Sequence, residues 1–428
     1  MPTHSFIRLL GCSLVGPLLF LYSCKKEGGG PGPGTQPVLP DADPVVFQTP
    51  NGEGFYISEN LTFSDNPYAE TDYLVKCPLY IQGGVTIVEA GTHIRFSGPE
   101  AGIYVIGDGG LTVYGNAQKP VLFDAADPHP GAWKGIFFGT DNQNNKLEHC
   151  IIKYAGSSVA DLMDEPAAVG ITRLNETDRN NCAWITHTQV YGSGGYGIYV
   201  SSLKGHFLQF GHNTVSRSNL APLGMPFRLA PVITTDCVLN PDSAQNTLPY
   251  VFLYNDGFNQ SIDIEADAQF VNPGIPYRIR GTEGVTLIGA HVTVAPGTTF
   301  EFGHEGGFCV RSGSLTAVGT PAAPIIFKGV QGGNGQWVGL SFHSDDAGNR
   351  LENCIVTGGG SKKSPLSDGI ANIVLGSYTG ASGSVTVTQS QITHSGGWAV
   401  AKKQSSVLTQ SGNQFIGNVS QPDVYVYP

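Results

Sequence analysis

A 22-residue phrase occurs twice in this chain. The first copy, GAWKGIFFGTDNQNNKLEHCII, runs over residues 131–152, and the second, GQWVGLSFHSDDAGNRLENCIV, runs over residues 335–356. The two copies are identical at ten of the 22 positions, including the Trp-x-Gly pair and the Leu-Glu-x-Cys run. Because self-similarity at a fixed distance is typical of repeat architectures, we expect one structural unit in two versions.

The similarity continues on both sides of this phrase. Upstream, VEAGTHIRF at residues 88–96 matches VAPGTTFEF at residues 294–302. Downstream, QVYGSGGYGIYV at residues 189–200 matches QITHSGGWAVAK at residues 391–402. The register between the copies drifts by only a few residues, so the whole of each unit derives from one pattern.

Inside each unit, short runs rich in β-branched and aromatic residues are separated by Gly, Asn, Asp or Pro, and no helical period is sustained. Similar runs recur about every two dozen residues, which favours an all-β solenoid over a sandwich or a barrel. Alternation in Gly135–Phe138 and in Gly339–Phe342 predicts that the middle positions, Phe137 and Ser341, face outward.

Each unit also resembles the right-handed parallel β-helix repeats of bacterial surface lipoproteins. The resemblance rests on the run aliphatic-x-x-Gly-Thr-x-aliphatic-x-Phe, on Gly-x-Trp-x-Gly-aliphatic and on Leu-x-x-Cys-x-Ile, and it covers most of residues 75–218 and 277–420. It implies a right-handed parallel β-helix made of two homologous multi-coil units. It implies no particular activity, because such coils serve as lyases, hydrolases, adhesins and plain scaffolds.

The N-terminus resembles that of an exported lipoprotein. Arg8 precedes an apolar stretch that is too short to span a bilayer comfortably, and the stretch ends in Leu21-Tyr22-Ser23-Cys24, which is similar to a lipobox. This resemblance implies lipid attachment at Cys24, with palmitate among the acyl chains, and a membrane partner. Lys25 in place of an Asp favours the outer membrane, and an ordinary secretory signal with an incidental cysteine is the alternative.

These features predict five segments. A lipoprotein signal peptide covers residues 1–23, and the lipidated cysteine with a Gly/Pro-rich flexible tether covers residues 24–50. The first β-helix unit covers residues 51–218, a connecting segment covers residues 219–257, and the second unit with a C-terminal cap covers residues 258–428.

Charge and cysteine spacing exclude two classes of function. The formal net charge of -11 argues against nucleic acid as a partner, because phosphate binding needs a basic face. No pair of cysteines has the spacing of a zinc site. Cys150 and Cys354 occupy the same place in the two copies, which predicts small buried residues rather than a disulfide between them.

Residues shared by both copies are expected to serve the fold. Trp133 and Trp337 stand beside glycines at equivalent positions, so we interpret them as corner packing rather than as sugar-stacking platforms. No catalytic residue is assigned on the basis of such duplicated positions. Function is therefore sought where the copies differ.

The largest difference follows the Leu-Glu-x-Cys strand. The first copy is acidic there, with Asp161, Asp164 and Glu165 followed by Glu176 and Asp178, whereas the second copy has lysines instead. These carboxylates are candidates for Ca²⁺ binding or for a glycan cleft, and a plain solvated loop is the alternative. A second acidic set, Asp263, Glu265 and Asp267, alternates with apolar residues, which predicts three carboxylates on one strand face.

Aromatic residues gather before residue 200. Trp184, Tyr191, Tyr196 and Tyr199 are close in sequence and are candidates for stacking on sugar rings.

Together these features predict a lipid-anchored protein of the outer membrane or cell surface that serves as a binding or adhesive module, with a polysaccharide or an envelope component as the partner. A β-helix polysaccharide lyase or glycoside hydrolase is the first alternative, and a purely structural envelope protein is the second. The sequence assigns no cofactor, and Ca²⁺ is the one metal for which it offers candidate ligands.

Overall fold

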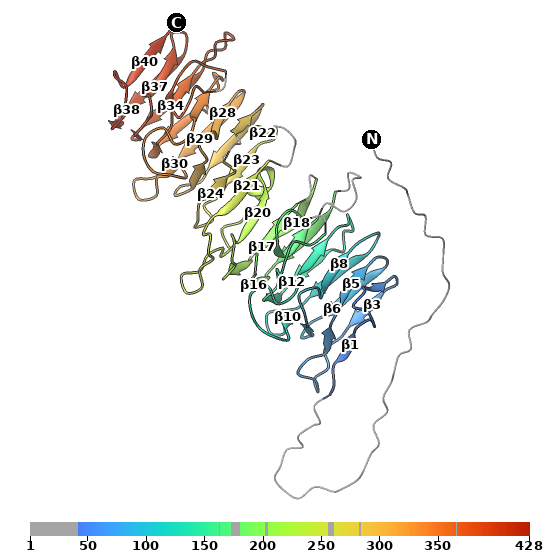
Figure 1. Cartoon of the computed structure of the whole chain (residues 1–428). Coiled ribbons are helices and arrows are strands. Elements are labelled where there is room, and N and C mark those ends of the chain that lie inside the picture. Colours follow the sequence, from blue (N-terminus) through green and yellow to red (C-terminus); the bar gives the residue numbers. More distant parts are fainter. Residues whose placement is uncertain are drawn as a thin grey trace, which may run out of the picture. The chain divides into compact units, whose positions relative to one another are not determined.

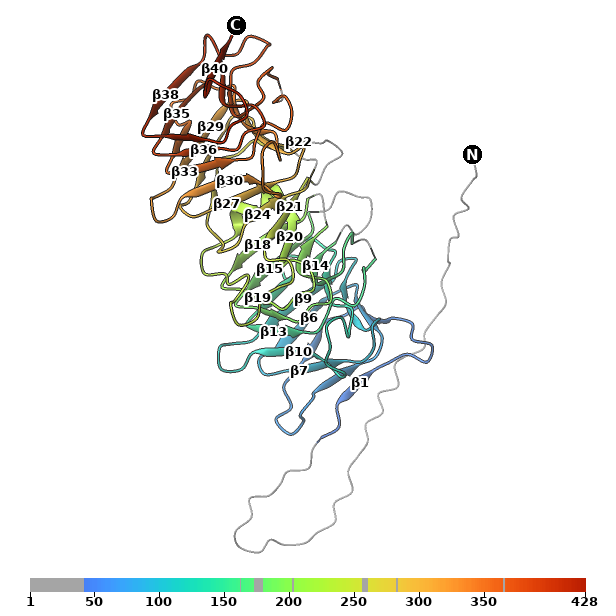
Figure 2. The ribbon, with the colours of Figure 1, turned by 60° about the vertical axis from the view of Figure 1, so that its left-hand side comes forward.

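The strands of this chain pair in parallel and form five sheets (Figure 1). The computed structural model of the chain describes residues 42–161, 163–172, 180–201, 204–255, 261–281, 284–364 and 366–428. Each coil contributes a strand to one sheet, turns a corner, contributes to a second sheet and then usually to a third (Figure 2). The predicted all-β parallel solenoid is thus confirmed, with about 13 turns.

The strands are grouped here as sheets A to E. Sheet A comprises β1 (Val45–Phe47), β4 (Tyr73–Val75), β7 (His93–Phe96), β10 (Val121–Ala125), β13 (Cys150–Lys153), β16 (Gln189–Tyr191) and β19 (Thr214–Ser216). Sheet B comprises β2 (Phe55–Ile57), β5 (Pro78–Ile81), β8 (Gly102–Val105), β11 (Ile136–Phe138), β14 (Ala167–Ile171), β17 (Tyr196–Val200), β20 (Leu223–Pro226), β21 (Val251–Tyr254), β24 (Tyr277–Ile279), β27 (Thr299–Phe302), β30 (Ile325–Gly329), β33 (Cys354–Thr357), β36 (Gln391–Thr393) and β39 (Gln414–Ile416).

The three remaining sheets are smaller. Sheet C comprises β3 (Leu61–Phe63), β6 (Val85–Glu89), β9 (Gly110–Tyr114), β12 (Lys146–Glu148), β15 (Cys182–Thr186) and β18 (His206–Gly211). Sheet D comprises β22 (Ser261–Ile264), β25 (Gly284–Leu287), β28 (Gly307–Val310), β31 (Gly339–Phe342), β34 (Ala371–Leu375), β37 (Trp398–Lys403) and β40 (Val424–Tyr427). Sheet E comprises β23 (Ala268–Phe270), β26 (Ala290–Val294), β29 (Gly313–Val318), β32 (Arg350–Glu352), β35 (Ser384–Thr388) and β38 (Val407–Ser411).

Alternate residues of each strand point into the solenoid and form columns of apolar side chains. On sheet A, one such column is Ile94, Phe123, Ile152, Val190 and Val215, in which each residue pairs with the next across neighbouring strands. All five are at most 1% exposed. Burial of these side chains holds the coils together, and the sequence needs only two inward apolar residues per short strand to supply it.

Trp133 and Trp337 occupy equivalent corners, and their interpretation as structural residues is confirmed. Both are fully buried. The Trp133 ring stacks on Phe96 with centroids 3.9 Å apart, and its Nε1 donates a hydrogen bond to the carbonyl oxygen of Lys153 at 2.7 Å. The Trp337 ring stacks in the same way on Phe302 at 4.6 Å. The Trp-x-Gly phrase thus marks a corner at which the chain enters the next strand.

The glycine of that phrase is required by the corner. Gly135 has a φ of +133°, and a Cβ built on it would lie 2.7 Å from the carbonyl oxygen of Ala168. Gly339 has a φ of +114°, and its Cβ would lie 2.5 Å from the carbonyl oxygen of Ala371. A side chain at either position would meet the backbone of the next coil, so the phrase recurs for steric reasons.

The two units share sheet B but are offset by one sheet position around the solenoid. Strand β7 of the first unit lies in sheet A, whereas its sequence equivalent β27 lies in sheet B. Strand β11 lies in sheet B, whereas its equivalent β31 lies in sheet D. The two halves of the chain therefore present equivalent residues on different faces.

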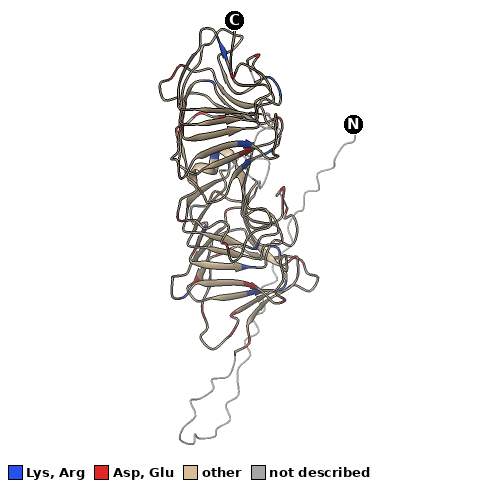
Figure 3. Cartoon of the chain, turned by 90° about the vertical axis from the view of Figure 1, so that its left-hand side faces the viewer, with Lys and Arg blue, Asp and Glu red and all other residues tan. Residues whose placement is uncertain are grey.

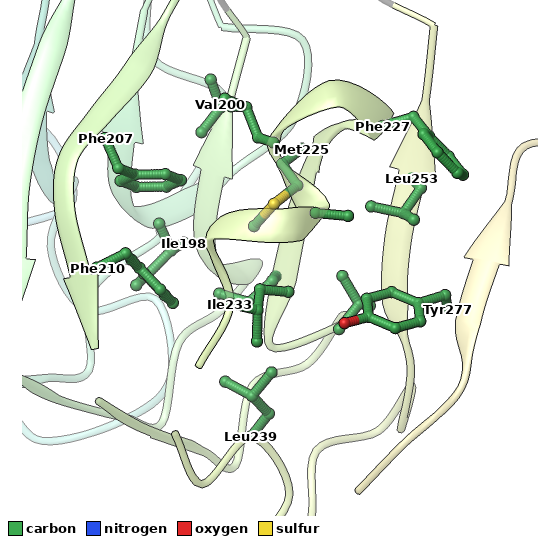
Figure 4. Packing of buried hydrophobic residues seen from close by; sticks show 14 of the residues in the cluster. Ile198, Val200, Phe207, Phe210, Met225, Phe227, Ile233, Leu239, Leu253 and Tyr277 are labelled. Carbon is green, nitrogen blue, oxygen red and sulfur yellow. The ribbon is translucent and has the colours of Figure 1, made fainter. Parts of the chain in front are cut away.

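The connecting segment produces this offset. It contributes β20, a 3₁₀ helix η1 (Phe227–Val232) and β21, and both of its strands pair within sheet B. Buried side chains fill the solenoid at this level (Figure 4), among them Met225, Phe227 and Ile233. Sheet B consequently continues from the first unit into the second as one sheet of 14 strands and joins the two units in one solenoid.

Two sequence expectations about side chains are resolved here. Phe137 packs in a cluster outside the main core and is only 1% exposed, because residues of the following segment cover it. Ser341 is likewise only 1% exposed. The cysteines among the described residues are all buried and free, as expected for Cys150 and Cys354.

We predict that the corner tryptophan contributes strongly to stability. Trp133→Ala should lower the free energy of unfolding by about 3–5 kcal/mol, because it leaves a cavity beside Phe96. Trp133→Phe retains a stacked ring but loses part of the buried ring volume and the hydrogen bond to Lys153, so its cost should be smaller, about 1–3 kcal/mol. Chemical unfolding followed by circular dichroism measures both. Tyr378→Ala, at a tyrosine 64% exposed, is the control and should change little; equal losses in all three variants would contradict the assignment.

Candidate functional site

Four aromatic residues form a continuous column on the outer face of sheet B. Tyr56 pairs with Tyr80, Tyr80 with Tyr104, and Tyr104 with Phe137, each across two neighbouring strands. Successive ring centroids lie 4.9, 5.1 and 5.2 Å apart, with interplanar angles between 18° and 29°. These distances are those of offset stacks, so the rings support one another across the coils. We call these four residues the aromatic column.

Exposure decreases along the aromatic column. Tyr56 is 57% exposed, Tyr80 and Tyr104 are half-buried, and Phe137 is buried. Phe137 is covered by Ala160 and Met163, which belong to the segment that follows strand β13. The aromatic column is therefore open to solvent at Tyr56, partly open at Tyr80 and Tyr104, and closed at Phe137.

The second unit lacks aromatic residues at the equivalent positions; its stacked pair, Trp398 and Tyr425, lies elsewhere on sheet D. The positions equivalent to Tyr56, Tyr80, Tyr104 and Phe137 on sheet D are Asp263, Thr286, Cys309 and Ser341, which pair with one another in the same register. The fold thus accepts small or polar residues at these places. The aromatic residues of the first unit are an addition that the architecture does not require.

The segment after β13 is fixed beside the aromatic column by polar contacts. Ser157 Oγ donates a hydrogen bond to the carbonyl oxygen of Pro99 at 2.7 Å. Lys134, whose side chain is buried, donates to Ser158 Oγ at 2.7 Å and forms an ion pair with Glu100 at 3.0 Å. These contacts hold the exposed candidate acid Asp161 three residues further along the chain.

The second unit makes the same anchoring contacts with different residues. Ser361 Oγ donates to the carbonyl oxygen of His304 at 2.8 Å, which is equivalent to the contact of Ser157. Lys362 lies 3.5 Å from Glu305, so the cation of this ion pair comes from the loop rather than from the strand entry. The anchor is therefore part of the scaffold, and what differs is Asp161 with the aromatic column.

The phenols of the aromatic column lie in an acidic field. Burial is the main cause that raises the pKa of Tyr104, and the charges of Tyr80, Asp161 and Glu100 raise it further. The pKa of Tyr80 is raised by burial first and then by Tyr56, Asp161 and Glu100. Tyr80 and Tyr104 consequently stay protonated near neutral pH and can each donate one hydrogen bond.

Of the other acids of this segment, Asp164 is exposed and two lie outside the described residues. Asp164 accepts a hydrogen bond from Ser201 Oγ at 2.7 Å, and Glu165 is partly buried and close enough to raise the pKa of Tyr196, after burial. Glu176 and Asp178 lie outside the described residues. Within the part of the chain that the structure describes, no group of three or more His, Cys, Asp or Glu residues could hold a metal ion.

The second acidic set is not arranged as expected. Asp263 lies on strand β22, Glu265 and Asp267 lie in the corner that follows, and β23 begins only at Ala268. Asp267 accepts a hydrogen bond from the backbone nitrogen of His291 at 2.7 Å. The prediction of three carboxylates on one strand face is wrong, because solenoid strands are short and the chain turns after Ile264.

The predicted aromatic cluster is also divided. Trp184 lies on sheet C, Tyr191 on sheet A, and Tyr196 and Tyr199 on sheet B, so the four residues do not form one strip. Tyr196 is 6% and Tyr199 is 1% exposed, and both pack beneath the segment that covers Phe137. Trp184 lies beneath the Lys146 ammonium group at 4.8 Å.

A second column, of histidines, occupies the corner between sheets C and A. The rings of His149 and His187 stack at 4.3 Å, and those of His187 and His212 stack at 4.4 Å. All three residues adopt a positive φ, between 50° and 54°. Asn353, Gln389 and Gly412 are the equivalents in the second unit, also at positive φ, so the corner requires this backbone conformation and not the imidazole.

Sequence reasoning missed both columns, although a signal was present. The strands of the aromatic column read GFYI, PLYI, GIYV and GIFF, with the aromatic residue of the column at the third place each time. Aligning single coils, rather than the two long units, would have brought these residues together.

A hollow of about 330 Å³ lies away from both columns. It is lined by residues of the first coils, including Asp43, Glu70 and Arg95. Arg95 forms an ion pair with Glu70 at 2.9 Å in this hollow.

Cys24, the predicted lipidation site, lies outside the described residues. No helix among the described residues is long and apolar enough to cross a membrane. In comparisons with known proteins, no family model, no curated protein and no solved structure gave a significant match to this chain.

We predict that the histidine column makes the stability of the protein pH-dependent. Burial is the main cause that lowers the pKa of His187, and the neighbouring His149 and His212 lower it further, against the opposing charges of Glu148 and Asp236. A lowered pKa means that the unfolded chain binds the proton more tightly, so stability should fall as the pH drops below about 6.5.

His187→Gln places the residue of the second unit in this position and should flatten that part of the pH dependence. The melting temperature of the full chain at pH 7.5, 6.0 and 5.0 measures the effect. His129→Gln, at an exposed histidine outside the column, is the matched control. An identical acid-induced decrease in His187→Gln and in the parent protein would contradict the prediction.

Proposed function

We propose that this chain is a lipid-anchored surface protein of the right-handed β-helix type that binds an extended glycan along the aromatic column. The observation that carries the proposal is the in-register row of Tyr56, Tyr80 and Tyr104, which is open to solvent in one unit and replaced by Asp263, Thr286 and Cys309 in the other.

Tyrosine suits this role for physical reasons. Its ring supplies a large, rigid apolar surface that packs against the C–H faces of a sugar, and its hydroxyl pairs with sugar hydroxyls. Little side-chain entropy is lost on binding, because the rings already support one another. Since neighbouring strands lie about 4.8 Å apart, the three tyrosines of the aromatic column span about 10 Å, which fits a run of about two sugar rings.

The shape of the surface supports a binder of polymers. The aromatic column lies on the outer face of a sheet, and solenoids use such extended faces for elongated ligands. A small-molecule enzyme would be expected to enclose its substrate in a deep pocket. The N-terminal features described above, an apolar stretch ending at Cys24 and a Gly/Pro-rich tether, support display of this face at a membrane surface.

We predict that the open tyrosines carry glycan affinity. Tyr56→Ala and Tyr80→Thr, the second of which copies Thr286, should each weaken binding of a responsive oligosaccharide about three- to tenfold, since a lost aromatic contact costs about 0.5–1.5 kcal/mol. Isothermal titration of the full chain in detergent against neutral, basic and acidic oligosaccharides measures this, with Tyr378→Ala as the matched control.

The same titrations separate the alternatives. Binding that persists unchanged in both column variants would remove the aromatic column as the site. Absence of binding to every oligosaccharide would favour a purely structural envelope protein. Appearance of shortened or unsaturated sugar products would favour a glycan-cleaving enzyme.

A further inference from the structure

The aromatic column is bordered by carboxylates on both sides. On the side where sheet B turns into sheet C, four connecting segments (58–60, 82–84, 106–109 and 139–145) follow the strands of the column. These segments contain Glu59, Asp108 and Asp141, all exposed, and neither a lysine nor an arginine. Charged residues make up only 13% of the chain, and Figure 3 marks their positions along the ribbon.

The opposite side, where sheet A turns into sheet B, is also acidic overall. Glu53, Glu100 and Asp161 are exposed there. Two lysines stand on this side, and one of them, Lys134, is buried in its ion pair with Glu100 at 3.0 Å. On this side, Lys76 is therefore the exposed lysine, whereas exposed carboxylates lie on both borders.

We infer that the glycan bound by the aromatic column carries protonated amino groups, as a polymer of free amino sugars does. This inference rests on the proposed function and adds the charge class of its ligand. A sugar ring stacked on Tyr56 or Tyr80 places its substituents toward the two borders, where an ammonium group finds carboxylates and the negative face of a phenol ring. A uronate would place its carboxylate against the same groups and be repelled.

The field at the phenols supports this direction of charge. The charges of Asp161 and Glu100 reach both Tyr80 and Tyr104 and raise their pKa, after burial. A cation placed on these rings is therefore stabilised by carboxylates that are already fixed, in particular by Asp161, whose loop is anchored through Ser157 and Ser158. Because these charges are already fixed in place, little conformational entropy is lost on binding. Complementary charges of this kind contribute more to specificity than to affinity.

The experiment uses a matched pair of ligands that differ only in charge. Glucosamine oligomers and their N-acetylated counterparts of the same length are titrated into the full chain in detergent at pH 5.5 and low salt, beside oligouronates of similar length. We expect the free-amine oligomer to bind about five- to tenfold more tightly than the acetylated one, oligouronates to bind most weakly, and the difference to shrink at 0.5 M salt.

Two variants test the origin of this preference. Asp161→Asn combined with Glu59→Gln should reduce the preference for the amine at least threefold and leave the affinity for the acetylated oligomer unchanged. Asp242→Asn, an exposed acid of the connecting segment, is the matched control and should change neither.

The outcomes distinguish this inference from the proposed function. Equal affinity for the two matched oligomers, or tighter binding of the oligouronate, overturns the charge class while leaving glycan binding in place. The inference is also overturned if polylysine binds with the same affinity as the glucosamine oligomer and if Tyr80→Thr does not change that affinity. The surface would then be a general cation binder. No binding of any oligosaccharide overturns the proposed function itself.

Discussion

Parallel stacking in register is the constraint on which the rest of this structure depends. Each residue lies over its equivalent one coil away, at a distance of about 4.8 Å. Equivalent side chains therefore contact one another and form columns along the solenoid. Inward columns such as Ile94, Phe123 and Ile152 supply the core. The same rule applied to the outer face turns a repeated tyrosine into a continuous aromatic surface, and applied to a corner it brings three histidines into contact.

The fold could be predicted from the sequence because its signals are local. The Trp-x-Gly corner and the Leu-Glu-x-Cys strand are each determined by a few consecutive residues, and their recurrence indicates a solenoid. The candidate site could not be predicted in the same way, because its members meet only after connecting segments of unequal length are closed. Tyr191 and Tyr196 are neighbours in the chain and lie on different sheets, whereas Tyr56 and Tyr104 are distant and belong to one column.

The offset between the two units limits what duplication can do for function. Sheet B continues through both units, but it is built from one strand type in the first and from another in the second. A face copied by duplication is therefore turned away from its original. The chain cannot extend the aromatic column by repetition, and along the same sheet the outward row changes to Arg278, Glu301 and Lys328, which pair as ions at 2.7 and 3.2 Å.

Divergence between the units is the best internal guide to function in such a chain. Thr286, Cys309 and Ser341 show that a folded coil of this pattern needs no aromatic residue on its outer face. Tyr56 is exposed to solvent and contributes little to the core. Contiguous exposed apolar surfaces are typical of interaction sites in soluble proteins. The anchoring contacts of Ser157 and Ser361 were kept in both units while the surface beside them changed. The scaffold is thus common to both units, whereas the row of tyrosines at these positions belongs to the first unit alone, as a binding face confined to one unit requires.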